Sequence, residues 1–278
     1  MSFNTLNITI LVDNQVNHGL IAEHGLSLWI ETEGKYVLFD TGPGIALGPN
    51  ARAIGVDLAK TETVVLSHGH YDHSGGVAHI LRQAPMSKVY CHPQAVQPRY
   101  AIRNGTPISI RMPQNCLTAL DKLPQQHLHW VQKPVLLSEQ IGLTGPIPRK
   151  TMYEDTGGPF YLDPEGKRPD PIKDDLALWI RQNDGLIVLV GCCHAGLVNT
   201  LNYVRHLNSG LKIKAVIGGL HLLNAGGRRM EETITALRLF KPNLVVPCHC
   251  TGDAAVALLC DALGKSVSPG AAGLAFKF

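Results

Sequence analysis

The chain has 278 residues, of which 45% are hydrophobic and 17% charged, a composition typical of a globular protein with an ample core. Its 25 Lys and Arg against 22 Asp and Glu give a net charge of +3, which is too small to favour a nucleic-acid or membrane-surface partner. No run reaches the roughly 18–20 apolar residues of a transmembrane span, and residues 1–13 lack the pattern of a signal peptide. The seven cysteines are odd in number and include the adjacent Cys192 and Cys193, which predicts reduced thiols and a cytoplasmic protein.

Alternating apolar residues and turn residues predict a mixed series of strands and helices in the first third of the chain. A hairpin is expected at Glu33-Gly34, and the Asp40-Thr41-Gly42-Pro43-Gly44 turn ends the second strand of that hairpin. The predicted strands are 7–12, 26–31, 35–40, 63–67 and 88–91, and the predicted helices are 45–54 and 74–83.

Two stretches interrupt this regularity. Segment 92–133 is rich in proline and weakly periodic, and we interpret it as an insertion of short helices and loops that covers the functional site of the protein. Segment 156–173 contains Gly-Gly-Pro and Pro-Asp-Pro turns and is a candidate lid. The alternative for both is a solvated surface excursion that does not contact substrate.

The last third of the chain repeats a strand followed by a helix. Three successive strands end at His194, His221 and His249. Because sites in layered α/β folds gather at strand ends, we expect these imidazoles to share one site. The neighbouring cysteines are interpreted as small buried residues rather than as ligands. The predicted strands are 176–181, 186–190, 213–217, 244–246 and 273–278, and the predicted helices are 197–207, 229–239 and 254–263.

The run Ser-His-Gly-His-Tyr-Asp-His-Ser-Gly-Gly at 67–76 follows a short apolar strand. His68 and His70 alternate along extended backbone and can face the same way. Asp72 and His73 follow as the chain turns into a helix, so they can reach a second point nearby. A lone histidine is more often structural, but four such groups at this spacing favour a metal site for Zn²⁺, Fe or Mn. Two metals about 3.5–4 Å apart are a known arrangement for hydrolysis.

Together with Leu-Phe-Asp-Thr-Gly at 38–42, this motif resembles that of the metallo-β-lactamase superfamily. The segments 191–196, 217–222 and 249–252 resemble one branch of it, which includes the archaeal dihydropterin-ribofuranosylaminobenzene phosphate synthases of methanopterin biosynthesis. The resemblance implies a mixed α/β fold in a single domain. That fold is a four-layer αββα sandwich of two mixed sheets with helices outside and a metal pair at one edge.

Carried over to this chain, the resemblance implies that His68 and His70 hold one metal and that Asp72 and His73 hold the second. Two divalent ions are expected, most often Zn, with Mn, Fe or Mg as alternatives. Asp40 would support these ligands by hydrogen bonds, unless it is a plain turn residue.

Ser67, at the start of the motif, is expected in the same supporting role. Many superfamily members add a third histidine, an aspartate that bridges both metals in a Thr-Gly-Asp turn, and a final histidine. Here the strand ending at His194 falls in the place of that turn, and it carries no aspartate. His194 would therefore be the third ligand or replace the bridge, while His221 and His249 compete for the final role. A single metal is the alternative that follows from the missing bridge.

The first functional hypothesis is metal-dependent hydrolysis of a small phosphoester, lactone or related ester. Asp72 would orient the attacking water or accept its proton. The second metal, or a protonated His221 or His249, would stabilise the developing oxyanion or the leaving group. Thr251 and Gly252, at a helix start, and Lys150 are candidate contacts for an anionic substrate group.

Two other hypotheses stay open. The branch resemblance implies a transferase that condenses a dihydropterin diphosphate with ribofuranosylaminobenzene phosphate, in which case the metal binds the diphosphate. A protein that binds a metal and a small molecule without turnover is the third, and the full ligand set argues against it.

Overall fold

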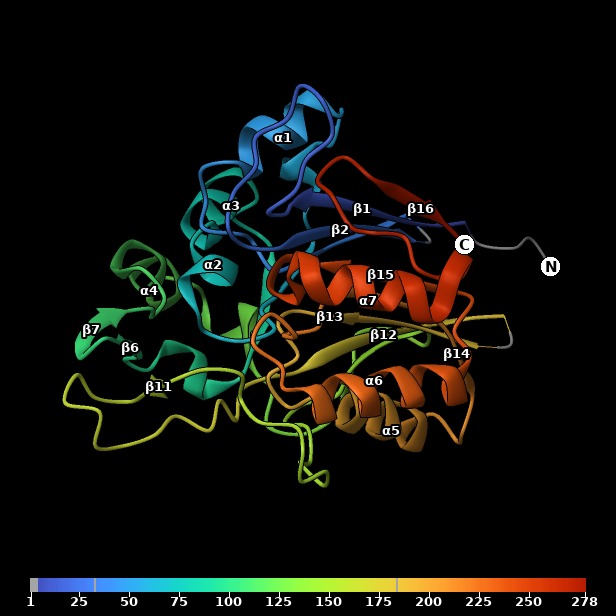
Figure 1. Ribbon diagram of the computed structural model, residues 1–278. Coiled ribbons are helices and arrows are strands. Elements are labelled where there is room, and N and C mark those ends of the chain that lie inside the picture. Colours follow the sequence, from blue (N-terminus) through green and yellow to red (C-terminus); the bar gives the residue numbers. More distant parts are fainter. Residues whose placement is uncertain (1–4, 33, 184) are drawn as a thin grey trace. The chain divides into compact units, whose positions relative to one another are not determined.

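The computed structural model describes residues 5–32, 34–183 and 185–278 (Figure 1). The chain divides into two compact units. The first unit contains residues 1–98, 110–130 and 270–278, and the second contains 99–109 and 131–269.

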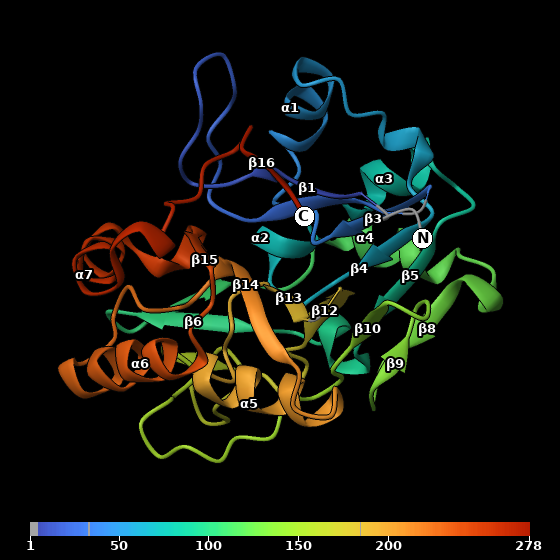
Figure 2. The same ribbon diagram turned by 90° about the vertical axis from the view of Figure 1, so that its right-hand side faces the viewer.

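The first unit is built on a seven-stranded sheet of order β16-β1-β2-β3-β4-β5-β8. The pairs from β16 to β3 are antiparallel and those from β3 to β8 are parallel, so the sheet is mixed as predicted. The C-terminal strand pairs with β1 at the edge (Figure 2). Glu33, in the predicted hairpin turn, lies outside the described residues. The strands are β1 (Leu6–Val12), β2 (Ser27–Thr32), β3 (Lys35–Phe39), β4 (Thr63–Val65), β5 (Lys88–Cys91), β8 (Leu128–Trp130) and β16 (Ala275–Lys277).

Helices and short 3-10 turns complete the core of the first unit, where Trp29, Leu38 and Leu66 are buried. The helix predicted over 74–83 is partly right: α3 ends at Gln83 as expected, but it begins at Val77, and Gly75-Gly76 separate it from α2. A Cβ on Gly75 would lie 2.1 Å from the carbonyl oxygen of Pro43, so this close approach of two backbone segments requires glycine at position 75. The elements are α1 (Leu47–Ala53), η1 (Leu58–Lys60), α2 (Tyr71–Ser74), α3 (Val77–Gln83), η2 (Pro93–Val96), α4 (Gln114–Asp121) and η3 (Gln125–His127).

The interpretation of segment 92–133 as short helices and loops is only partly right. Its end forms strand β8 of the first sheet. Residues 99–109 belong to the second unit, where β6 (Tyr100–Arg103) and β7 (Thr106–Ser109) pair with β11 (Phe160–Tyr161) in a small sheet. Strands of two to four residues are too short to show alternation, which explains why the sequence did not reveal them.

The second unit is built on a six-stranded sheet of order β15-β14-β13-β12-β10-β9. Its central strand β13 is buried at every residue, which is the reason for its unbroken apolar sequence. The predicted repeat of strand and helix is confirmed, although β9 and β10 were not predicted. The elements are β9 (Val135–Leu136), β10 (Ile141–Leu143), β12 (Ala177–Gln182), β13 (Gly185–Val190), α5 (Leu197–Leu207), β14 (Lys212–Gly219), α6 (Gly227–Phe240), β15 (Leu244–Cys248), η4 (His249–Thr251), α7 (Asp253–Leu263) and η5 (Gly264–Ser266).

Strands β13, β14 and β15 are parallel, so the turns that follow them lie at the same edge of the sheet. Each of these turns contains a residue other than glycine with left-handed backbone: Cys193 at φ 57°, His221 at φ 49° and His249 at φ 47°. Such conformations cost free energy and persist where the surrounding structure fixes them, most often at functional sites. Three strained turns at one edge of the sheet therefore make this edge the candidate site of the second unit.

Two sequence expectations concern the whole chain. Within the described ranges, no helix is long and apolar enough to cross a membrane. None of the seven cysteines, all of which the structure describes, is in a disulfide.

Candidate metal centre

The motif of the first unit forms the turn between β4 and α2. His68 follows the strand, and His70 has extended backbone at the start of α2. The Nε2 atom of His68 lies 3.0 Å from Nδ1 of His70, and the rings of His68 and His73 are 4.3 Å apart. The Nε2 atom of His73 lies 3.8 Å from Oδ2 of Asp72. The four predicted ligands of this motif are thus neighbours, and all of them are buried.

Gly69, between the first two histidines, fixes the path of this turn. A Cβ at this position would lie 2.0 Å from the carbonyl oxygen of Ala95 in η2. Because that oxygen belongs to the backbone, it cannot move aside cheaply. The glycine of the motif is therefore required by a close approach of two chain segments.

Asp40 is the centre of the hydrogen bonds that support the motif. Its Oδ1 accepts from the Ser67 amide at 2.7 Å, and its Oδ2 accepts from the Ser67 hydroxyl at 2.6 Å and from Nδ1 of His73 at 2.7 Å. Since a carboxylate only accepts, the Ser67 hydroxyl proton points to Asp40, and its oxygen accepts from Nδ1 of His68 at 2.9 Å. The Nε2 atoms of His68 and His73 therefore carry the lone pairs that a metal needs.

This donor set fits a divalent cation. Imidazole nitrogens and a carboxylate are the preferred ligands of Zn²⁺ and are also accepted by Fe and Mn. Lone pairs held this close repel one another unless a proton or a cation lies between them. His24, which the sequence did not suggest, places its Nε2 3.6 Å from Oδ2 of Asp72 and adds another imidazole to the cluster. His24 stands in a loop without any motif, so no sequence signal could have found it.

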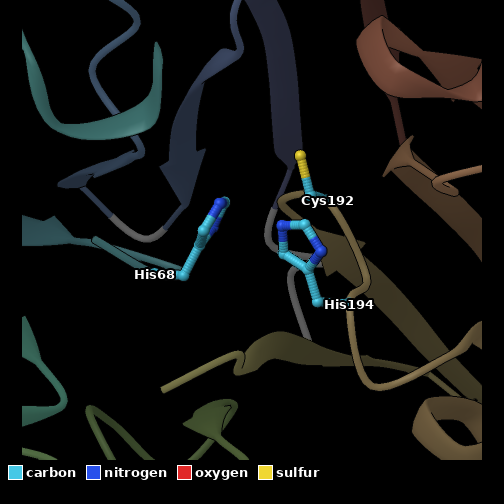
Figure 3. A group of neighbouring side chains, drawn as sticks. All are labelled: His68, Cys192 and His194. Atoms are coloured by element: carbon cyan, nitrogen blue, oxygen red, sulfur yellow. The ribbon is translucent and has the colours of Figure 1, made fainter. Parts of the chain in front are cut away.

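In the second unit, His194 and His221 lie side by side, with ring centroids 4.4 Å apart. Figure 3 shows Cys192 and His194 on the turn after β13, and His68 on the turn after β4. The Nδ1 atom of His194 lies 2.8 Å from the carbonyl oxygen of Thr156. A guanidinium nitrogen of Arg149 donates to the carbonyl of His194 and holds its backbone.

Cys192, His221 and Cys250 form a second group of ligand atoms, all within 4.8 Å of one another. Burial opposes ionisation of Cys250, but hydrogen bonds from Cys192 and His221 and the nearby imidazoles hold the pKa of this thiol well below its usual value. Both cysteines are buried, as expected of packing residues. The grouping also fits the alternative that the sequence made less favoured, in which these thiols are ligands, because a thiol of lowered pKa binds soft metals.

The remaining predicted residues lie in different surroundings. His249 begins the turn after β15, and Gly252 precedes α7. The Thr251 hydroxyl donates to the carbonyl of Cys248 at 2.7 Å and accepts from the Leu220 amide at 3.0 Å, so it joins the ends of β15 and β14. The side chain of Lys150 is exposed.

Asp175 supports the turn that carries His194, and the sequence did not single it out. Its Oδ2 accepts from the Ala195 amide at 2.7 Å. Burial raises the pKa of Asp175 to about 7, and Asp174 adds to this, while the Ala195 hydrogen bond and Arg149 act in the opposite direction. Asp175 therefore carries a proton in the folded protein over a pH range where an exposed aspartate would be charged.

This shift predicts a pH-dependent loss of stability. The folded-state pKa of about 7 lies above the ordinary value of 3.8, so the contribution to the free energy of unfolding is full below about pH 4 and is lost as pH rises towards 7. The contribution is at most roughly 4 kcal/mol. Asp175→Asn cannot titrate and keeps an acceptor for the Ala195 amide, so it should lose less stability between pH 5 and pH 8. Urea unfolding of both metal-free proteins over this range measures the difference, and parallel curves would contradict the prediction.

Comparison with known proteins places these observations in a family. Residues 21–210 match the metallo-beta-lactamase superfamily. An uncharacterized protein of Methanocaldococcus jannaschii is 31% identical over 255 residues, covering 91% of this chain and 93% of the relative. The 7,8-dihydropterin-6-methyl-4-(beta-D-ribofuranosyl)-aminobenzene-5'-phosphate synthase of the same organism is 28% identical over 243 residues, covering 83% of this chain and 82% of the relative.

A solved structure supports the same assignment. The crystal structure of a metal-dependent hydrolase of the β-lactamase superfamily matches with a TM-score of 0.82 at 27% identity, covering 98% of this chain and 99% of that one. This likeness confirms the mixed α/β fold predicted from the sequence, and the family match confirms the resemblance carried by the histidine motif. The chain belongs to the metallo-β-lactamase superfamily.

Proposed function

We propose that the protein is a metal-dependent hydrolase that acts on a small phosphoester, lactone or related ester. The observation that carries this proposal is the turn after β4, where three histidines and an aspartate converge. Ser67 and Asp40 bind the Nδ1 atoms of two of these histidines, so the Nε2 atoms keep the lone pairs that a metal needs. Two findings agree with a hydrolase: the chain belongs to the metallo-β-lactamase superfamily, and the similar solved structure is that of a metal-dependent hydrolase.

The proposal includes two divalent cations, most often Zn²⁺, with Mn, Fe or Mg as alternatives. His68 and His70 would hold one and Asp72 and His73 the other. We extend the proposed ligand set to the histidines at the ends of β13 and β15, His194 and His249. The support for this extension is the family and the position of each histidine at a strand end.

A bound divalent cation lowers the pKa of a coordinated water towards 7 and so supplies a nucleophile at neutral pH. Asp72 would orient this water or take its proton. His221 would donate a proton to the leaving group. Burial disfavours its charged form, but the facing sulfur of Cys250 outweighs burial and raises the pKa of His221 above its usual value, with a smaller contribution from the carbonyl of Gly157.

The substrate is proposed to be a small molecule with a negatively charged group. Gly252 and Thr251 stand at the start of α7, where the backbone amides of a helix and its dipole favour an anion. Lys150 is proposed as an added positive contact.

A transferase is the second candidate, and the 28% identical synthase favours it. In that reaction a dihydropterin diphosphate condenses with ribofuranosylaminobenzene phosphate and releases pyrophosphate. The metal would then bind the diphosphate, and no water would attack.

Metal removal tests both candidates. We expect dialysis against a chelator to abolish hydrolysis of at least one member of a panel of phosphodiester, phosphomonoester, lactone and thioester substrates, and re-addition of Zn²⁺, Mn²⁺ or Fe²⁺ to restore it. Turnover that survives complete metal removal would contradict the metal-dependent mechanism. Pyrophosphate release from the two synthase substrates, without hydrolysis of the panel, would replace the hydrolase by the transferase.

A further inference from the structure

Residues 154–160, here called the strap, contact both histidines of the second unit that stand side by side. The carbonyl oxygen of Thr156 lies 2.8 Å from Nδ1 of His194. The next carbonyl oxygen, of Gly157, lies 3.3 Å from Nε2 of His221. Two successive carbonyls of one segment therefore meet two different imidazoles.

These contacts fix which ring nitrogens carry protons. A backbone carbonyl can only accept a hydrogen bond, so each imidazole nitrogen that faces one must be an N–H. His194 is held with its proton on Nδ1, and His221 is held with a proton on Nε2. The atoms turned away from the strap are then Nε2 of His194 and Nδ1 of His221, so the two rings are fixed in opposite senses.

The strap is anchored on two helices of its own unit. The Glu154 carboxylate is buried and accepts from the amides of Val198 at 2.8 Å and Asn199 at 3.0 Å, at the start of α5. The Asp155 carboxylate accepts from Arg229 of α6 at 2.6 Å. Arg229 is itself buried, so its side chain has little freedom to move. Both anchors lie directly before the two carbonyls that meet the histidines.

The strap is also shaped around the two rings. The ring of Phe160 is steeply inclined to both imidazoles, at 85° to His194 and 65° to His221, with ring centroids 5.4 Å and 6.2 Å apart. Gly157 has left-handed backbone at φ 84°, and a Cβ built on it would lie 1.8 Å from Cδ2 of His221. Glycine is required here because any side chain would displace the imidazole that the carbonyl holds.

We propose that the strap is a fixed positioning element, which sets the tautomer and orientation of His194 and His221 through the carbonyls of Thr156 and Gly157. This role differs from that of the lid suggested by the sequence for segment 156–173, whose first five residues belong to the strap. The effect on catalysis rests on the proposed function, in which Nε2 of His194 would bind a metal and His221 would serve the leaving group. The hydrogen-bond arrangement itself can be measured without metal or substrate.

The test compares Gly157→Ala with Gly166→Ala. Both glycines lie in the irregular segment 156–173 and have left-handed backbone, at φ 84° and φ 70°, so both variants carry a similar backbone strain. The nearest atom to a Cβ at Gly166 is the flexible end of Ile102, at 2.7 Å. Gly166→Ala is therefore a matched control that leaves the histidine contacts intact.

The first readout is ¹⁵N NMR of histidine side chains in the metal-free protein. At a pH high enough to leave His221 neutral, we expect wild type and Gly166→Ala to show His194 protonated at Nδ1 and His221 protonated at Nε2. Gly157→Ala should lose the single Nε2–H state of His221 and show exchange between forms. In the metal-loaded proteins, kcat/KM should fall by about 10–100-fold in Gly157→Ala, the range found when a group that orients a ligand is lost. Gly166→Ala should stay close to wild type.

Two results would overturn the proposal: a wild-type His194 protonated at Nε2, or Gly157→Ala spectra identical to those of Gly166→Ala. If Gly157→Ala does not fold, Phe160→Leu tests the same element without adding a Cβ, and unchanged histidine signals in that variant would also count against it. Failure of the proposed function has a different signature. The wild-type tautomers would then be as stated, while no protein hydrolyses any substrate of the panel.

Discussion

His70→Ala is expected to release bound metal and to reduce hydrolysis by more than about 100-fold. The side chain of His70 lies against Nε2 of His68 and would be a direct ligand. Loss of a group that only orients a ligand costs about 10–100-fold, so loss of a ligand should exceed that range. The backbone carbonyl of His70 accepts the Ser74 hydroxyl at 2.8 Å, and alanine keeps this contact, so α2 should still form. Elemental analysis of protein purified without added metal, together with the substrate assay, measures both effects.

The matched control is His206→Ala. His206 is exposed on α5, and its replacement removes an imidazole without touching either histidine cluster. About two metal equivalents in wild type and in this control, with a sharp decrease in His70→Ala, would agree with a dinuclear hydrolase. About one equivalent in wild type would favour a single metal. Full metal content and full activity in His70→Ala would remove the turn after β4 from the proposed site.

Asp40→Ala is expected to give the second large effect, on stability as well as on metal binding. It leaves three buried donors without their acceptor: the amide and hydroxyl of Ser67 and Nδ1 of His73. Buried donors that lose their partner cost about 1–3 kcal/mol each, and relaxation recovers part of this, so the free energy of unfolding should fall by roughly 2–5 kcal/mol. The left-handed backbone at Asp40, φ 59°, adds strain for alanine.

Asp40→Asn separates support of the ligands from stability. Asparagine tolerates left-handed backbone and keeps the size of the side chain, but its amide group can satisfy only some of the three donors. We expect metal affinity to fall by about 10–100-fold with a smaller loss of stability than in Asp40→Ala. Titration of the metal-free proteins with Zn²⁺ and urea unfolding give the two quantities. Wild-type affinity in both variants would show that Asp40 is a plain turn residue.

The sequence determined most elements of both sheets and the histidine motif that identifies the family. Strand β13 and helix α5 are visible in the sequence because the hydrophobicity of each residue follows its burial: the strand is an unbroken apolar run, and the helix has apolar residues at helical spacing. The spacing of His68, His70, Asp72 and His73 is also local, so the family could be identified from it. The predicted bounds of α5 agree with the structure at both ends.

What only the tertiary structure decided involves residues far apart in the chain. The contact of Asp40 with His73 spans 33 residues, and that of Thr156 with His194 spans 38. No periodicity encodes such pairs, since their geometry depends on which strands become neighbours and where the turns between them lie. The same holds for the grouping of Cys192, His221 and Cys250, which stand at the ends of three adjacent parallel strands. The sequence therefore shows which chemical groups are present. Strand order and turn geometry decide which of these groups are in contact and which ring nitrogen of each histidine is turned away from its hydrogen-bond partner.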